Sequence, residues 1–153
     1  MKIVDYLSET DVIPQLEATT REGVIREMVQ HLKQAGKIAD AETLVGILLD
    51  REMLGSTGIG NGVAIPHGRL EGLKEILLVF GRSVSGVEFD AHDGQPVNLF
   101  FLLVAPEDSA GLHLKALARI SRVVKNPECR TALLASQDRA GLFRVIREED
   151  ERN

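Results

Sequence analysis

The sequence predicts an α/β fold, a three-layer sandwich in which helices flank a mixed central β-sheet and the C-terminal third is helical. Two observations lead to this prediction. Apolar runs of strand length alternate with amphipathic helical segments through the first two thirds of the 153 residues, and helical periodicity continues alone to the end. The run over residues 97–104 is almost continuously apolar, which is typical of a central strand buried on both faces.

Two amphipathic helices are expected before the first long strand. The first follows Thr20, a residue type favoured at the N-cap, and ends at Gly36. The second follows Asp40, another good N-cap residue, and ends at Gly55. Each helix has one apolar face that must pack against the sheet.

Helical periodicity disappears after the second helix, where four glycines fall within residues 55–62. We expect a loop there that leads into a short strand over residues 63–65. Two longer apolar runs, residues 75–82 and 97–104, have the length of strands, and Asp93–Gly94 between them indicates a tight turn.

The C-terminal third is expected to be helical. A third helix begins at Ser109 and ends at Asn126, and two shorter helices begin at Pro127 and Ser136. The charged tail, residues 148–153, is expected to fray. No repeat or linker divides the chain, so residues 1–153 form one domain.

Composition excludes several classes of function. A formal net charge of -5 and an aromatic content of 4% argue against direct nucleic-acid binding. The longest apolar run, residues 99–105, is far shorter than the roughly 20 residues that span a bilayer. Since the N-terminus also has no basic-then-apolar leader, we expect a cytoplasmic protein without membrane insertion.

Neither a metal nor a cofactor is expected. Cys129 is the single cysteine, cannot form an internal disulfide, and is expected to be buried without a chemical role. No pair of histidines has the spacing of zinc ligands. His31 and His92 are interpreted as a helix-edge residue and a turn residue.

An accessible imidazole is expected at His67, because of the two residues that precede it, Ile65 and Pro66. Proline cannot donate to a sheet and holds the preceding residue extended, so the strand should end there and leave His67 at the rim. Gly68 follows and adds no bulk. An imidazole with an ordinary pKa of about 6.5 is mostly neutral and nucleophilic at cellular pH, which makes His67 a candidate phosphoryl acceptor.

A phosphoryl acceptor needs cations and N–H donors nearby, and the sequence offers three sources. Arg51 extends the inward face of the second helix and has a planar fork for phosphate oxygens. His113 stands in the first turn of the third helix, where an anion is favoured and a neutral imidazole fits. The glycine loop can aim successive N–H groups at one point. The residues expected to bind phosphate in this loop are Ser56, Thr57, Gly58, Gly60 and Asn61.

Each of these residues also has a structural interpretation. His67 after a strand could instead be a packed or solvent-facing residue, Arg51 could merely complement the C-terminal end of its own helix, and His113 could make a structural bond. The glycines by themselves are a weak signal. They are not followed by the lysine of a P-loop, and Val63 stands where a dinucleotide fingerprint requires glycine.

The segment GSTGIGNGVAIPHG, residues 55–68, resembles the active-site signature of a known family. The family is the mannitol/fructose-type (type 2) enzyme IIA of the bacterial phosphoenolpyruvate-dependent phosphotransferase system. The similarity begins at Arg51, resumes over residues 89–106 and again at His113, and within the family it is strongest to the nitrogen-regulatory branch, EIIA-Ntr. The chain is therefore expected to be a single enzyme IIA domain.

The resemblance implies roles for three residues. The phosphorylated histidine of the family corresponds to His67, its second active-site histidine to His113, and its phosphate-contacting arginine to Arg51. It also implies an α/β sandwich with a mixed sheet, phosphorylation at Nε2, and an HPr-like phosphocarrier protein as donor. The protein would be a phosphotransferase component that turns over only with partner proteins.

Three functions remain open at this point. In the first, which a standalone domain favours, the protein is a phosphohistidine carrier that regulates target proteins such as transporters or sensors by its phosphorylation state. In the second it is a sugar-specific IIA component that passes phosphate to a IIB domain, although no fused IIB, IIC or HPr domain is present. In the third it is a non-catalytic anion-binding module in which His67 only donates a hydrogen bond.

Overall fold

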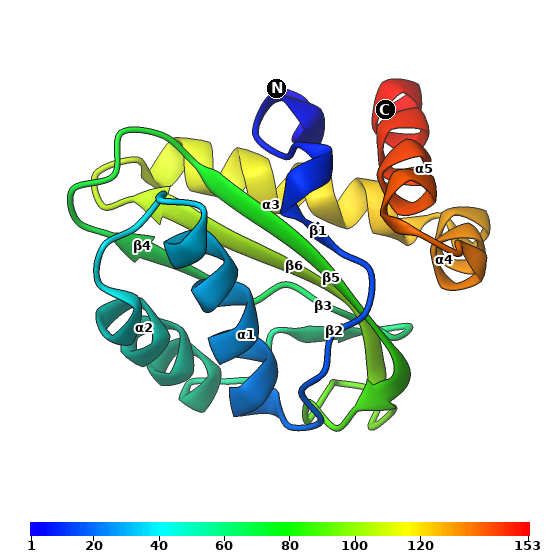
Figure 1. Ribbon diagram of the computed structural model, residues 1–153, viewed down its shortest axis with the longest axis horizontal. Coiled ribbons are helices and arrows are strands. Elements are labelled where there is room, and N and C mark those ends of the chain that lie inside the picture. Colours follow the sequence, from blue (N-terminus) through cyan, green and yellow to red (C-terminus); the bar gives the residue numbers. More distant parts are fainter.

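The computed structural model describes residues 1–153 and contains a six-stranded mixed sheet with helices on both faces (Figure 1). The strands are β1 (Val12–Ile13), β2 (Gly58–Gly60), β3 (Val63–Ala64), β4 (His67–Leu70), β5 (Leu77–Val87) and β6 (Val97–Pro106). The α-helices are α1 (Arg21–Gln34), α2 (Ala41–Met53), α3 (Ala110–Lys125), α4 (Pro127–Ala135) and α5 (Arg139–Arg152). Two 3₁₀ turns, Ile3–Asp5 and Glu9–Asp11, precede β1.

The long antiparallel strands β5 and β6 form the centre of the sheet, whose strand order is β1-β5-β6-β3-β2. β1 pairs with β5 in parallel. On the other side of β6, two short parallel strands share one edge: β3 pairs with its first half, Val63 opposite Leu99, and β4 with its second half, His67 opposite Leu103. The candidate site residue His67 thus lies beside a central strand that is almost entirely buried.

Two apolar cores lie on opposite faces of the sheet. Alternate residues of β6 point to opposite faces, so that Phe101 and Leu103 pack in the core under α3 and α5, while Phe100 and Leu102 pack in the core under α1 and α2. β6 is therefore buried on both faces, as its continuous apolar run predicted. The predicted three-layer α/β sandwich with a mixed sheet and a helical C-terminal third is confirmed.

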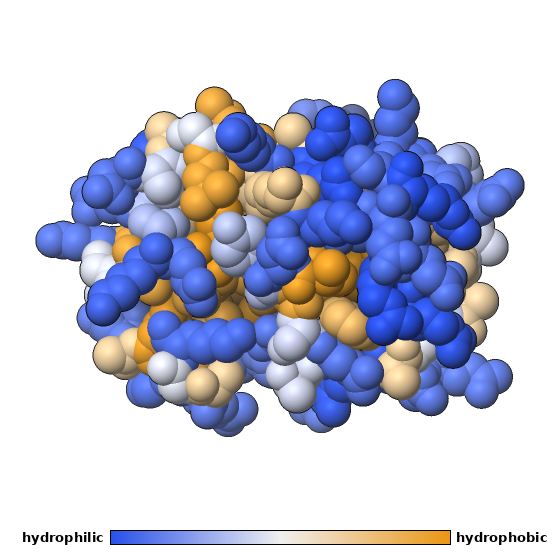
Figure 2. All heavy atoms as spheres, turned by 90° about the horizontal axis from the view of Figure 1, so that it is seen from above, coloured by the Kyte–Doolittle hydropathy of each residue, from blue (hydrophilic) through white to orange (hydrophobic).

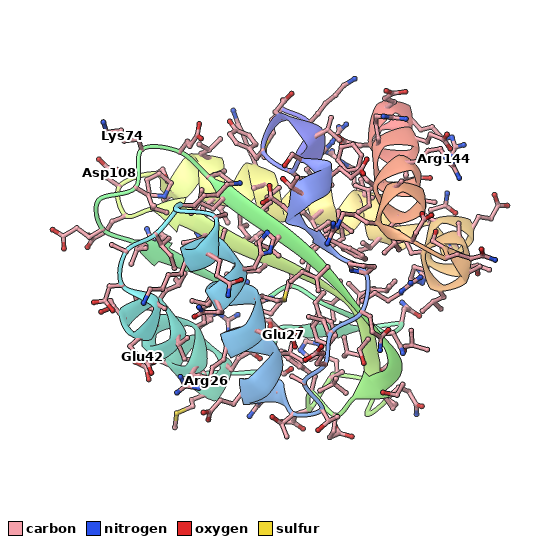
Figure 3. All side chains as sticks on the ribbon, viewed as in Figure 1. Arg26, Glu27, Glu42, Lys74, Asp108 and Arg144 are labelled. Atoms are coloured by element: carbon pink, nitrogen blue, oxygen red, sulfur yellow. The ribbon has the colours of Figure 1, made fainter.

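Two helix starts agree closely with the sequence, whereas the last helix, expected from Ser136, begins at Arg139 because Asp138 is its N-cap. The Thr20 side chain accepts a hydrogen bond from Gly23 N, and the Asp40 side chain accepts one from Thr43 N, as expected of N-caps. On the surface, Arg26 of α1 donates to Glu42 of α2 at 3.0 Å (Figure 3). Such an exposed pair adds little stability, so the packing of α1 and α2 depends on their apolar faces.

Three expectations about the strands were wrong in detail. Gly58–Gly60, expected as loop, forms β2 and pairs with β3, which itself stops at Ala64. The strand expected over residues 75–82 runs to Val87. The chain breaks at Pro66 as expected, but it resumes a strand, β4, at His67. β4 pairs with β6, which is distant in sequence and leaves no local pattern, whereas β2 pairs with the neighbouring β3 in a glycine-rich segment that lacks the apolar alternation of a strand.

The prediction that residues 148–153 fray was also wrong. α5 begins after Asp138, its N-cap, and continues to Arg152, with the Asp150 side chain completely buried. Arg119 Nε of α3 donates to Asp150 Oδ1 at 2.8 Å, and Val4 N donates to Asp150 Oδ2 at 3.1 Å. These partners from other segments hold the charged end of the helix in place.

The single cysteine, the surface and the helix composition also bear on the expectations from the sequence. Cys129 is buried as expected, and burial raises the pKa of its thiol to about 11. In the view that looks down on the N-terminal segment and α5, apolar atoms show in separate areas among mostly hydrophilic residues (Figure 2). No helix combines the length and the apolar composition needed to cross a bilayer.

Candidate active site around His67

The position of His67 is set by an interruption between two short strands. Pro66 has no N–H, but its carbonyl accepts a hydrogen bond from Leu103 N at 2.9 Å, so the backbone stays attached to β6 across the break. His67 then begins β4 opposite Leu103. The histidine is therefore held by sheet pairing on a rigid element.

The His67 ring has a defined tautomer. Its Nδ1 lies 2.7 Å from the carbonyl oxygen of Ile65, two residues back in the chain. Because a carbonyl oxygen can only accept, Nδ1 carries the proton and donates, and the lone pair is on Nε2. Nε2 is consequently the nucleophilic atom of this imidazole.

Burial also keeps this imidazole neutral. Burial lowers the pKa of His67 below its ordinary value, and the positive charge of Arg51 lowers it further. The hydrogen bond to Ile65 and the charge of Glu52 act in the opposite direction but do not outweigh burial. At neutral pH the ring is thus unprotonated at Nε2.

His113 from α3 lies against His67. The two ring centroids are 5.3 Å apart and the rings meet edge to face, with an interplanar angle of 85°. Burial lowers the pKa of His113, and nearby positive charge on His67 and Arg69 would lower it further. Its Nε2 is buried and has no hydrogen-bond partner in the protein. An unpaired buried polar atom costs about 1–3 kcal/mol, and an oxyanion placed here would satisfy it.

Arg51 has the structural role considered for it from the sequence and keeps donors for the other, which stays a prediction. It lies in the last turn of α2, and its Nη1 donates to Gly55 O at 2.8 Å, which closes the turn after the helix. This is the one hydrogen bond that its guanidinium makes within the protein, out of five N–H groups available. The remaining donors are free for a ligand.

An open pocket of about 730 Å³ brings His67, His113 and Arg51 together. α2 forms one wall, α3 the other, and β4 the floor between them. The lining residues are Ile47, Asp50, Arg51 and Leu54 of the α2 end, His67, Gly68 and Arg69 of β4, and Ala110, His113, Leu114 and Leu117 of α3. An adjoining pocket of about 400 Å³ shares Arg51 and His67 and also includes Ser56, Thr57 and His92.

Gly68 sets the distance between two parts of the site. A Cβ at this position would lie 2.9 Å from Ile47 Cγ2 of α2, which is closer than real carbon atoms approach. The absence of a side chain lets β4 and α2 come together here. Since Arg51 is on α2 and His67 on β4, this contact controls how near the guanidinium lies to the imidazole.

The glycine-rich segment does not form the nest of free N–H groups that the sequence suggested. Thr57 N donates to Glu52 Oε1 at 3.1 Å, and Gly58 N donates to Ser56 Oγ at 3.0 Å. Asn61 N donates to Asp93 Oδ2 at 3.0 Å. The Ser56 hydroxyl itself donates to a backbone carbonyl at 2.7 Å. These donors are occupied within the protein.

The glycines serve packing and chain reversal. A Cβ at Gly58 would lie 2.9 Å from Ala91 Cβ, and Gly60 and Asn61 adopt positive φ angles of 94° and 58°. Gly58, Gly60 and Asn61 line neither pocket, whereas Ser56 and Thr57 line the smaller one. A role of these five residues in binding phosphate stays a prediction.

Sequence reasoning gave no role to two residues of the site. Glu52 is buried beneath the loop and accepts hydrogen bonds from both the backbone N and the hydroxyl of Thr57. Arg69 lies two residues after His67 and lines the same pocket. Strand alternation would have placed Arg69 beside His67, but the sequence was interpreted as ending the strand before it.

With the fold and the pocket established, comparison with known proteins identifies the class. The chain matches the family model described as phosphoenolpyruvate-dependent sugar phosphotransferase system, EIIA 2, over residues 5–149, and it belongs to this family. The resemblance found in the sequence is thereby confirmed, and the protein is a phosphocarrier or regulatory component of a phosphotransferase system.

Individual relatives point to two branches of the family. The chain is 39% identical over 147 residues to a nitrogen regulatory protein of Bradyrhizobium diazoefficiens, covering 95% of each chain. It is 37% identical over 150 residues to the fructose-specific EIIABC component of Bacillus subtilis, which takes in 98% of this chain but 24% of that longer protein. The solved structure of the nitrogen regulatory protein IIA-Ntr of Neisseria meningitidis matches with a TM-score of 0.87 at 31% identity, covering 94% of this chain and 98% of that one.

Proposed function

We propose that His67 accepts a phosphoryl group at Nε2 from a phosphorylated HPr-like carrier protein, and that the phosphorylation state of His67 regulates target proteins. The observation that carries this proposal is the hydrogen bond from Nδ1 to the Ile65 carbonyl, which leaves the Nε2 lone pair free in a pocket that also contains a guanidinium. In the other tautomer, Nε2 would carry the proton and the ring would present no nucleophilic atom to the pocket.

In the proposed step, the Nε2 lone pair of His67 attacks phosphorus while the bond from phosphorus to the donor's nitrogen breaks. The electron pair of that bond stays with the donor imidazole, so no oxidant or further reactant is needed. The protein must then neutralise the oxygens of a group that carries close to two negative charges. Arg51 offers its free N–H donors, and His113 offers a neutral ring whose buried Nε2 has no other partner.

The regulatory role is supported by relatives that match over nearly their whole length. The Bradyrhizobium and Neisseria proteins are both named as nitrogen regulatory proteins, and this chain covers 95% and 98% of them. The similarly close fructose-specific relative supports a second candidate, a IIA component that hands phosphate on to a IIB domain. The two candidates share the same chemistry at His67 and differ in the fate of the phosphoryl group once it is bound.

Phosphorylation with purified components tests the proposal. Incubating the protein with phosphoenolpyruvate, enzyme I and an HPr-like protein should add one phosphoryl group per chain, labile in acid and stable in base. His67→Ala should abolish the adduct, while His31→Ala, which removes an imidazole from α1 outside the pocket, should leave it unchanged. An unmodified wild-type protein would favour an anion-binding module, and an adduct that persists in His67→Ala would show that another residue is phosphorylated.

The stability of the adduct separates the two candidates. Adding a sugar-specific IIB domain to the purified phosphorylated protein should leave the phosphoryl group on His67 if the role is regulatory. Rapid loss of the group to the IIB domain, at a rate similar to its arrival from the donor, would identify a transport component.

A further inference from the structure

We propose that Arg69 is a second cation for the phosphoryl group, so that the phosphorylated His67 is held between the guanidinium groups of Arg51 on α2 and Arg69 on β4. This inference rests on the proposed phosphorylation of His67 and deepens it. Strand β4 would then supply both the nucleophile, His67, and a positive charge that stabilises the phosphorylated product.

The Arg69 side chain points to the same face of the sheet as the nucleophile. His67 and Arg69 are separated by one residue in β4, and alternate residues of a strand point to the same face. Their partners across the ladder, Leu103 and Ala105, both belong to the core on the α3 side of the sheet. The intervening Gly68 faces the other way, toward α2. His67 and Arg69 therefore both project to the α3 side.

Arg69 also lies within reach of the phosphorylated atom. Two residues along a strand span about 6–7 Å, which is within the reach of an extended arginine side chain. Both residues line the same pocket of about 730 Å³. A phosphoryl group on Nε2 of His67 would occupy part of the space between them.

The Arg69 guanidinium has no competing partner. Its one contact in the protein is from Nη1 to the backbone oxygen of Glu107 at 3.5 Å, at the outer limit of a hydrogen bond, and it forms no ion pair. The side chain is exposed and can turn toward the pocket at little cost. Its guanidinium thus has free donors for phosphate oxygens.

The charge of the pocket depends on Arg69. Two cations, Arg51 and Arg69, and one carboxylate, Asp50, line it. Burial lowers the pKa of His67 and of His113, so neither imidazole contributes a full positive charge at neutral pH. The charge of Arg69 also lowers the pKa of His113, as expected of a cation that lines the same pocket. Without Arg69, the positive charge left would only balance Asp50.

Titration of the phosphoryl group tests this role directly. The full chain would be phosphorylated, and its ³¹P resonance followed as pH is lowered, for the wild-type protein, Arg69→Gln and Arg69→Lys. A nearby cation stabilises the dianion, so Arg69→Gln should raise the pKa of the phosphoryl group, with Arg69→Lys between the two. The matched control is Arg122→Gln, which removes the same charge from an exposed position of α3 outside both pockets.

The phosphotransfer equilibrium gives a second readout. Arg69→Gln should shift the equilibrium about 3- to 10-fold toward the phosphorylated donor, as expected for loss of a partly exposed ion pair with a dianion. Arg122→Gln should leave it unchanged. Because Arg69 is exposed, the variants should unfold at the same urea concentration as the wild-type protein.

Three results would overturn the inference. An unchanged ³¹P titration and equilibrium in Arg69→Gln would show that Arg69 does not contact the phosphoryl group. A higher KM for the donor protein with an unchanged titration would make Arg69 a docking residue for the partner. A wild-type protein that acquires no phosphoryl group would refute the proposed function itself, and this inference with it.

Discussion

The arginines of the pocket and the arginines of the core differ in how fully their donors are used. Arg51 makes one hydrogen bond within the protein and Arg69 one long contact. Arg119, by contrast, is 7% exposed and uses three nitrogens, donating to the Asp150 carboxylate, the Asp150 carbonyl and the Asn153 carbonyl. Its guanidinium has no donor nitrogen left without a partner.

Arg82 of β5 also directs its donors into the protein, through Nε and Nη1. It is 6% exposed, and its donors go to the backbone oxygens of Pro14, Leu133 and Ser136, from three separate segments. A buried guanidinium with its partners inside the protein stabilises the fold. Free donors gathered beside a neutral imidazole, as in the pocket, indicate instead a place prepared for an anion that arrives from outside.

The largest effect on the free energy of unfolding is expected when Arg119, whose donor nitrogens all have partners within the protein, loses its carboxylate partner. Asp150→Ala should reduce the free energy of unfolding by about 3–5 kcal/mol, because it leaves the buried charge of Arg119 unpaired. Urea unfolding would measure it, with Glu148→Ala on the exposed side of the same helix as the control, expected to change stability by less than about 0.5 kcal/mol. A loss below about 1 kcal/mol for Asp150→Ala would show that Arg119 finds other partners easily.

The next effect concerns catalysis and not stability. Arg51→Lys should slow phosphotransfer to His67 about 10- to 100-fold, since a point charge does not reproduce the planar fork, while the urea midpoint stays nearly unchanged. Rapid-quench measurement of adduct formation would test this. Equal rates in Arg51→Lys and the wild-type protein would leave Arg51 with only its structural bond to Gly55 O.

A buried polar pair beneath the pocket should give an intermediate effect on stability. Glu52→Ala leaves the Thr57 N–H without an acceptor and should cost about 1–3 kcal/mol of unfolding free energy. Glu52→Gln keeps an amide oxygen for that N–H and should cost less. Urea unfolding and hydrogen exchange at the Thr57 amide would compare the two, and equal losses would show that the carboxylate charge matters more than the hydrogen bond.

The smallest effect is on the pH dependence of stability. Burial lowers the pKa of His67 and of His113 in the folded state below the ordinary value of 6.5, so the unfolded chain binds more protons near and below that pH. The stability associated with the neutral rings is therefore complete above pH 6.5 and is lost as pH falls from 6.5 through the lower pKa values of the folded state. Urea midpoints measured from about pH 7.5 to 5.5 should fall less steeply when both histidines are replaced by alanine. Identical slopes would contradict the burial of these rings.

The sequence predicted those parts of the molecule that depend on short-range patterns. The caps Thr20 and Asp40, the apolar run of β6 and the break at Pro66 all act within a few residues, and each lies where it was expected. His67, His113 and Arg51 were also chosen correctly as neighbours, although the family resemblance was needed to bring three distant positions together.

The parts that were missed depend on contacts that form only in the folded chain. Asp150 was expected in a frayed tail but pairs with Arg119 of α3, and Gly58, expected in an anion-binding loop, already donates its N–H to Ser56 Oγ. Arg69 was overlooked because the strand was expected to end before His67 and no strand was expected after it. A local sequence pattern cannot reveal which polar groups already have hydrogen-bond partners. The presence of free donors is what distinguishes the arginines of the pocket from those of the core.

The division of one edge of β6 between β3 and β4 has a consequence for insertions and deletions. Side chains alternate along a strand, so a shift of β4 by a single residue would carry the imidazole from the α3 side of the sheet to the α2 side, away from His113. The two residues between β3 and β4, Ile65 and Pro66, therefore tolerate no change in length. The turn between Leu70 and Leu77 comes after the nucleophile and can vary in length. Among related chains, variation in length should accordingly be found in that turn and not in the short link before it.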